Sequence, residues 1–244
     1  MSYEPSRTEN NWSSGGPGGR PQRREPIFNL PSVVTWLLVF MWLVQIARDT
    51  VLTRSQNTWL LVEGGFIPWR YTAQGLEYGL AWIWTPVTYS LLHGGYGHLI
   101  VNSIWLMAFG AVVARRIGTQ RFLVFWVLSA IAAAAFYWPF HIGSPVPVIG
   151  ASGVVSALMG AAARFAFPRD GRFNRVNAHL LPRNGLIEAL TNRTVLIYVA
   201  VWFGVNALAA IGFAAGARIA WEAHMGGFLF GFLAFALFDP LPDK

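Results

Sequence analysis

Residues 93–116 read HGGYGHLIVNSIWLMAFGAVVARR. The middle of this stretch, residues 97–114, is apolar and long enough to cross a bilayer core as a helix, which takes roughly 17–25 residues. It begins with two histidines and an asparagine and ends at two arginines. Polar groups within a membrane span are costly and indicate a functional site by default. This segment therefore predicts a membrane protein with polar chemistry at the start of a span.

The composition of the whole chain agrees with a lipid environment. Of its 244 residues, 55% are hydrophobic and 12% are charged, whereas soluble domains carry roughly 25% charged residues. Its 12 Trp and 18 Phe suit apolar helices with interfacial aromatic anchors. Cysteine is absent, which excludes disulfides, thiol catalysis and cysteine-based zinc sites.

The hydrophobic pattern predicts an all-α membrane protein, a six-helix transmembrane bundle formed by residues 29–240. The expected spans are 30–47, 97–114, 122–140, 149–166, 194–215 and 222–238. Residues 1–28 are rich in Gly, Ser, Pro and Arg, so we expect a disordered tail. Residues 48–96 mix apolar and polar groups and are expected to form a large structured loop lying partly in the membrane interface.

The distribution of charge gives the topology. The net charge is +7, which suits either nucleic acid or the excess of Lys and Arg on the cytoplasmic side of membrane proteins. With both termini inside, only Arg48, Arg54, Arg70 and Arg218 of the 18 basic residues fall outside. Nucleic-acid binding would not require this alternation, so we expect cytoplasmic termini and no nucleic-acid partner. The basic loop 167–193 is expected to be solvated.

Three polar clusters share one depth in this topology. His93, His98 and Asn102 stand at the start of the second span, Ser152 at the start of the fourth, and His224 at the start of the sixth. These three spans run in the same direction, from outside to inside. Their starts therefore converge near the outer face.

Rows of small residues provide a way to bring the serine and the histidine together. Ser152, Ser156 and Gly160 form one row, and Ala223, Gly227 and Gly231 form another. Such rows let helices approach closely in lipid, so we expect the fourth and sixth spans to pack together. A serine beside a histidine is a nucleophile beside its general base.

The second span adds hydrogen-bond donors. His98 and Asn102 are four residues apart and share one helix face. Donors aimed at a developing oxyanion are worth about 3–4 kcal/mol, and the backbone N–H of Ser152 is a third candidate. Taken singly, each feature has a structural explanation: a serine can bond its own helix, an asparagine can join two helices, and His93 can anchor a loop.

Together these motifs resemble those of the rhomboid family of intramembrane serine proteases. HGGYGHLIVN matches the pattern H-x4-H-x3-N, GASG from Gly150 matches G-x-S-G, and AHMGGFLFG matches A-H-x-x-G-x-x-x-G. The resemblance covers about residues 30–240. It implies a dyad of nucleophile Ser152 and base His224, and substrates that are transmembrane proteins cut within or beside their membrane segment. It assigns Asn102 and His98 to the oxyanion hole, with His93 as a supporting motif residue, and it implies no cofactor.

The sequence also departs from the family pattern. Ser156 stands where many members carry a tyrosine that stacks on the base. Trp202, Trp221 and Phe228 are candidates to orient His224 instead. The short connection from Ala215 to Ala220, with Trp221 beside it, is a candidate mobile gate.

Two other classes of function stay open. One is an inactive rhomboid-like protein that binds transmembrane segments without cutting them. The other is a small transporter or channel, which would favour internal repeats and broken helices at mid-membrane. The absence of a targeting segment favours a bacterial inner membrane, while the substrate and the oligomeric state stay open.

Overall fold

The computed structural model describes residues 30–167, 178–210 and 220–241. Apart from isolated bridge residues, among them the pair Phe66 and Val148, their regular structure is helical. In chain order the helices are α1 (Ser32–Thr50), α2 (Arg54–Gly64), η1 (Pro68–Tyr71), α3 (Ala73–Leu76), α4 (Thr85–Thr88), η2 (Tyr89–Leu91), α5 (Tyr96–Trp105), η3 (Leu106–Gly110), α6 (Ala111–Tyr137), η4 (Trp138–Phe140), α7 (Ser152–Ala163), η5 (Ala178–Leu180), α8 (Leu186–Thr191), α9 (Arg193–Ala210), α10 (Trp221–Ala234) and η6 (Phe235–Leu237). The predicted tail, residues 1–28, lies outside the described residues.

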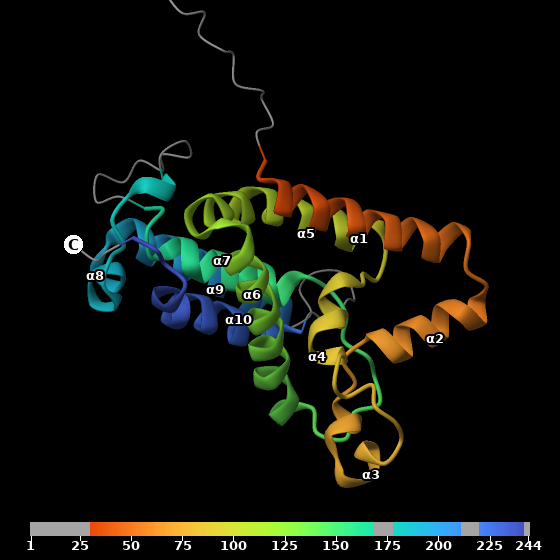
Figure 1. Ribbon diagram of the computed structural model, residues 1–244. Coiled ribbons are helices and arrows are strands. Elements are labelled where there is room, and N and C mark those ends of the chain that lie inside the picture. Colours follow the sequence, from red (N-terminus) through yellow and green to blue (C-terminus); the bar gives the residue numbers. More distant parts are fainter. Residues whose placement is uncertain (1–29, 168–177, 211–219, 242–244) are drawn as a thin grey trace, which may run out of the picture.

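The long first loop is built from short helices that stand to one side of the longer ones (Figure 1). The indole of Trp84 donates to the Glu63 carbonyl at the end of α2, at 2.8 Å. The Phe66–Val148 bridge and a bond from the Trp69 N–H to the Ser144 carbonyl (3.0 Å) join this loop to the segment before α7. The loop therefore holds in place the chain that leads into Ser152.

The second and third predicted spans fall in the helical residues Tyr96–Phe140, a run of 45 residues in which two helical segments meet at Gly118. A helix of that length measures about 68 Å, more than twice the roughly 30 Å of a bilayer core. Gly118 interrupts it with φ 76° and ψ 168°, a left-handed conformation that glycine adopts without steric cost. The chain changes direction there, within the predicted connection between residues 114 and 122.

Helices α7 and α10 lie side by side with their backbones almost touching (Figure 1). A methyl group at Gly227 would overlap the carbonyl of Gly153, and one at Gly231 would overlap the carbonyl of Ala157. The residue numbers of these contacts increase along both helices in the same direction, so α7 and α10 run parallel. On α7 the residues against the α10 backbone are Gly153, Ala157 and Gly160. Gly160 belongs to the predicted row, while the first two contacts fall one residue beyond Ser152 and Ser156.

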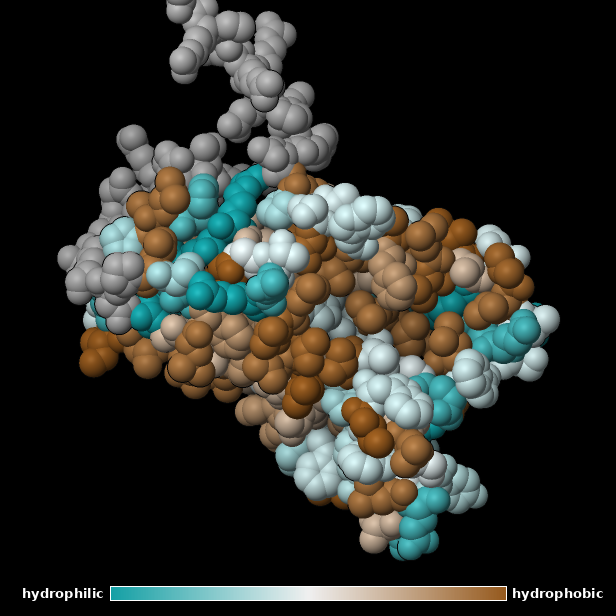
Figure 2. All heavy atoms as spheres, in the orientation of Figure 1, coloured by the Kyte–Doolittle hydropathy of each residue, from teal (hydrophilic) through white to brown (hydrophobic). Residues whose placement is uncertain are grey.

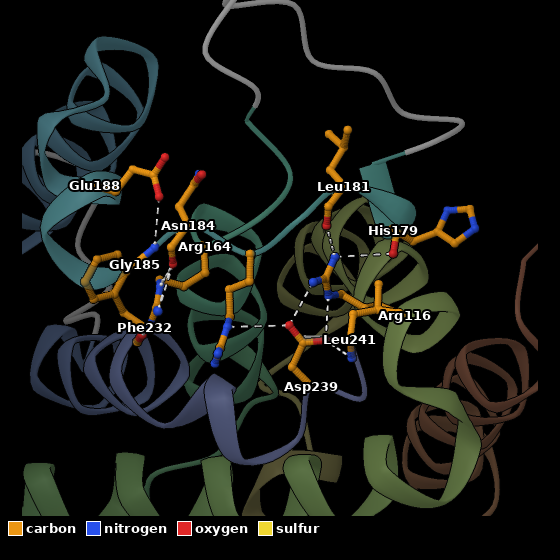
Figure 3. Close-up of polar contacts among 11 residues, drawn as sticks. Arg116, Arg164, His179, Leu181, Asn184, Gly185, Glu188, Phe232, Asp239 and Leu241 are labelled. Atoms are coloured by element: carbon orange, nitrogen blue, oxygen red, sulfur yellow. Dashed lines mark hydrogen bonds and ion pairs between the residues drawn. The ribbon is translucent and has the colours of Figure 1, made fainter. Parts of the chain in front are cut away.

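A buried cluster of charges joins the far ends of these helices (Figure 3). Arg116 donates to both carboxylate oxygens of Asp239, at 2.9 and 2.8 Å, and both side chains are 0% exposed. Arg164 donates to the carbonyls of Asn184 and Phe232. Arg183 lies 3.7 Å from Asp239 and its side chain is only 9% exposed.

The prediction that the basic loop is solvated was therefore wrong for Arg183. Its guanidinium takes part in a buried ion-pair cluster because Asp239 supplies a carboxylate at the same place. A buried arginine persists where a charge partner and carbonyl acceptors replace water. The other arginines of the loop between residues 168 and 177 lie outside the described residues.

The surface in Figure 2 is hydrophobic across its middle, and hydrophilic residues gather toward its ends. Two helical stretches of the described chain, Ser32–Thr50 and Tyr96–Phe140, are long and apolar enough to cross a membrane. Three shorter apolar helices accompany them: Ser152–Ala163, Arg193–Leu208 and Trp221–Leu237. The fifth predicted span, 194–215, is described only as far as residue 210.

Candidate active site

The histidine loop before α5 is anchored from α1. The guanidinium of Arg48, on the buried side of α1, donates to the backbone carbonyl of His93 and to the Asn57 side chain. Gly95 then begins α5 with φ 149°, a conformation that side chains rarely adopt. Because α1 fixes the carbonyl of His93, the two residues that lead into α5 start from a defined position.

The ring of His93 is enclosed by protein and 1% of it is exposed. The N–H of Ala151 donates to its Nε2 at 3.5 Å, a long contact with the residue before Ser152. Burial, aided by His98 and Arg48, lowers the pKa of His93 to about 3. A neutral ring keeps the acceptor lone pair that the Ala151 N–H requires, so His93 supports the nucleophile loop.

The ring of His98 faces that same loop. The N–H of Gly94 donates to His98 Nδ1 at 3.4 Å, which leaves the ring proton on Nε2. A Cβ atom at Gly150 would lie 2.8 Å from His98 Nε2 and 3.7 Å from the Ser152 hydroxyl oxygen. The His98 ring and the Ser152 hydroxyl therefore both lie beside Gly150, with the Nε2 edge of His98 against that residue.

Gly150 has a φ of 129°, and its N–H donates to the Tyr89 carbonyl at 2.9 Å. The Tyr89 hydroxyl in turn donates to the Ala130 carbonyl of α6 at 3.0 Å. The loop ahead of Ser152 is thus tied to the body of the protein immediately before α7 begins.

A cavity of about 410 Å³ opens beside Ser152 between α5, α7, α9 and α10. Its lining is mostly apolar, with Trp and Val side chains, and its polar members are Asn102, Ser152, Ser156, Tyr198, Asn206 and His224. Ser152 and His224 face the same space without a direct hydrogen bond in the described structure. Such bonds are often long without substrate and shorten in the reacting complex.

The side-chain amide of Asn102 is the free donor in this cavity. Asn102 is 3% exposed, and its Nδ2 has no hydrogen-bond partner within the described chain. Leaving a buried donor unpaired costs about 1–3 kcal/mol. A donor held unpaired beside a serine is available to a ligand oxygen.

Asn206, on α9, is a site residue that the sequence reasoning missed. Its Oδ1 lies 2.6 Å from Nδ1 of His224. The signal was present: an amide interrupts the apolar run TVLIYVAVWFGVNALAA, and polar groups within spans indicate function.

The other predicted residues differ in their relation to the site, and of these Trp202 lines the cavity. The rings of Trp202 and Phe228 stack on each other, with centroids 4.5 Å apart, and no ring in the described chain stacks on His224. Trp221 starts α10 with its ring 6.0 Å from that of Phe140, and it is not among the described residues lining the cavity. The connection 211–219, part of the predicted gate, lies outside the described residues.

Glu222, the residue after Trp221, is buried and lies 3.1 Å from Nε2 of His141. The His141 ring stacks on Tyr137 at the end of α6. This contact fixes the first turn of α10, the turn that carries His224, against α6. No cluster of three His, Asp or Glu side chains suited to a metal occurs in the residues that the structure describes.

Comparison with known proteins adds to this geometry. Residues 81–240 match the family described as "Rhomboid domain". The chain is 29% identical over 215 residues to "Rhomboid protease GluP" of Bacillus subtilis (strain 168), covering 88% of this chain and 35% of that protein. It is 27% identical over 170 residues to "Rhomboid protease GlpG" of Yersinia pseudotuberculosis serotype I (strain IP32953), covering 69% and 51%. The chain thus spans only a third to a half of the length of these relatives.

Proposed function

The chain belongs to the rhomboid family of membrane proteins, and on that premise we propose that it is an intramembrane serine endopeptidase. One observation carries the proposal: a single cavity between four helices holds Ser152, His224 and the unpartnered amide of Asn102. A nucleophile, a base and an oxyanion donor are the groups that acyl transfer requires. The relatives named as rhomboid proteases support the same chemistry.

The proposed mechanism uses only these groups. Ser152 Oγ attacks the carbonyl carbon of the substrate peptide, and its proton passes to His224 Nε2. Asn102 Nδ2, His98 Nε2–H and the Ser152 N–H donate to the oxyanion. The C–N bond then breaks as His224 protonates the leaving amine. Water then attacks the acyl-enzyme ester while His224 takes its proton, and His224 passes that proton to Ser152 Oγ as the ester C–O bond breaks. The product acid leaves and ionises to a carboxylate.

We further propose six transmembrane spans with both ends in the cytoplasm. The stretch Tyr96–Phe140 is long enough for two spans and changes direction at Gly118. Residues from α5, α7 and α10 line one cavity with Ser152, which supports a site near one face of the membrane. We place the protein in a bacterial inner membrane, with transmembrane proteins as substrates cut within or beside their membrane segment.

The role of Trp221 as a gate stays a prediction. Its position at the first turn of α10, three residues before His224, supports it, since a movement there would alter access to the base.

The proposal is tested with a fluorophosphonate probe, which reacts with activated serines. The full chain is purified in detergent and compared with Ser152→Ala and His224→Ala, and the same variants are tested for cleavage of a single-span reporter in proteoliposomes. We expect labelling and cleavage by the unaltered chain and at least a ~100-fold loss in each variant, the range expected for removal of a general base.

A folded chain that neither labels nor cleaves would contradict the protease proposal and favour the alternative, an inactive rhomboid-like protein that binds transmembrane segments. Labelling that persists in Ser152→Ala would mean that another serine is the nucleophile. Thermal unfolding in the same detergent separates these outcomes from a loss of structure.

A further inference from the structure

We propose that Asn206 is a positioning residue that holds His224 in the tautomer required for catalysis, so that the site works as a Ser–His–Asn triad. This inference rests on the proposed protease function and deepens it. It assigns a role to α9 and explains how the site operates with Ser156 in place of an aromatic ring.

The contact is short and enclosed. Asn206 Oδ1 and His224 Nδ1 are 2.6 Å apart, and Asn206 is 8% exposed. Its Nδ2 donates to the carbonyl of Trp202, one turn earlier on α9, at 2.8 Å. Both ends of the amide are therefore engaged.

The orientation of the amide follows from its partners. A backbone carbonyl only accepts, so the group facing Trp202 has to be the NH2. The oxygen then faces His224 and accepts, so the proton of the neutral ring resides on Nδ1. Nε2, the atom that takes the serine proton, therefore keeps its lone pair. The Trp202 carbonyl thus fixes the tautomer of a histidine on another helix.

An amide also suits this depth better than a carboxylate. A buried charge within a membrane span is expensive, whereas an amide supplies the acceptor without a net charge. When His224 gains a proton during the reaction, its Nδ1–H donates to Asn206 as a charge-assisted bond, which is about twice as strong as a neutral one. Asn206 therefore favours the transition state over the resting state.

The rings proposed from the sequence do not supply this orientation. Trp202 and Phe228 stack on each other, and Ser156, which lines the cavity, has no ring. The hydrogen bond from α9 is the described contact that fixes the rotation of the imidazole.

The first experiment measures the tautomer itself. The chain with ¹⁵N-labelled histidine is studied by NMR, and His224→Ala assigns the signal. We expect a protonated Nδ1 and a bare Nε2 for His224, and a mixture of tautomers in Asn206→Leu. A proton on Nε2 in the unaltered chain would overturn the proposal, whether or not the protein is a protease.

The second experiment measures catalysis with the reporter substrate. Asn206→Leu is expected to lower kcat about 10- to 100-fold with KM within about twofold, a smaller loss than removal of the base. Asn206→Asp keeps the acceptor and is expected to recover part of the rate. Leu208→Ala, exposed on the same helix, is the control and keeps full activity.

Equal rates for Asn206→Leu and Leu208→Ala in an active protein would overturn the role of Asn206 and leave the protease function intact. If the unaltered chain is inactive but His224 has the expected tautomer, the protease function is overturned and the contact between Asn206 and His224 is kept. If Asn206→Leu does not fold, the role of Asn206 is still tested by the His224 tautomer in the unaltered chain and by the cleavage rate of Asn206→Asp.

Discussion

Gly150 shows how a residue without a side chain shapes the site. Its φ of 129° favours glycine, and any Cβ would lie 2.6 Å from Cε1 of His98. The two constraints have different causes, backbone strain and steric overlap, so they can be separated by experiment.

Gly150→Ala is expected to lower the rate of fluorophosphonate labelling at least tenfold, because the methyl group displaces His98 from the Ser152 hydroxyl. Gly79→Ala is the matched control: Gly79 has a φ of 127° with nothing within 4 Å of its missing Cβ. The Gly79→Ala variant has the same backbone strain, about 1–3 kcal/mol, without the steric overlap, so it should be labelled at the rate of the unaltered chain. Equal loss in both variants would attribute the effect of Gly150 to strain alone.

At this scale the sequence predicted the types of residue needed but not their partners. Ser152, His224 and Asn102 were proposed from position in the spans, and the structure brings them to one cavity. Asn206 was missed because a window average absorbs one amide into an apolar run. Asn206 contacts a residue 18 positions away in the sequence, and the pattern of neighbouring residues does not predict a contact at that distance.

At the scale of elements, the separation of α7 and α10 is set by glycine. The overlap expected at Gly227 involves the backbone of Gly153, the residue after the nucleophile. A displacement of α10 at this point moves His224 relative to Ser152.

Gly227→Ala is expected to lower the free energy of unfolding by about 1–3 kcal/mol, as overpacking does, and to reduce cleavage. Gly204→Ala, on α9 with open space around it, changes stability by about 1 kcal/mol or less. Thermal unfolding and reporter cleavage are measured for both. Unchanged stability in Gly227→Ala would mean that the helices can separate without cost.

The hydrophobic pattern of the sequence predicted the ends of these helices to within a few residues. The span expected at 149–166 is α7 at Ser152–Ala163, and the one at 222–238 is α10 with η6, ending at Leu237. The break at Gly118 falls in the connection expected between the spans 97–114 and 122–140, whereas the polar loop that the arginines near residue 116 suggested is reduced to this one non-helical residue. Arg116 instead turns inward to a carboxylate.

At the scale of the whole molecule, the Arg116–Asp239 pair joins segments 123 residues apart. Arg116 also lies over the Phe165 ring at 4.4 Å and donates to the His179 and Leu181 carbonyls. The cluster therefore connects α6, the end of α7, the following loop and the end of α10 (Figure 3).

Asp239→Ala is expected to lower the free energy of unfolding by about 3–5 kcal/mol, because it leaves a buried guanidinium without its counter-charge. Glu63→Ala breaks the more exposed pair with Arg70 and should cost about 1 kcal/mol or less. Chemical or thermal unfolding in detergent compares the two. Similar losses would mean that water reaches Arg116.

The same pair has a consequence for biosynthesis. Asp239 follows the last described helix, whereas Arg116 emerges from the ribosome more than a hundred residues earlier. A nascent chain therefore carries an unneutralised arginine until α10 has been made, and α10 is also the helix that delivers His224. The buried ion pair and the cavity that holds Ser152 and His224 both depend on α10 and the residues just after it, so a chain truncated before α10 lacks His224 and leaves Arg116 without its counter-charge.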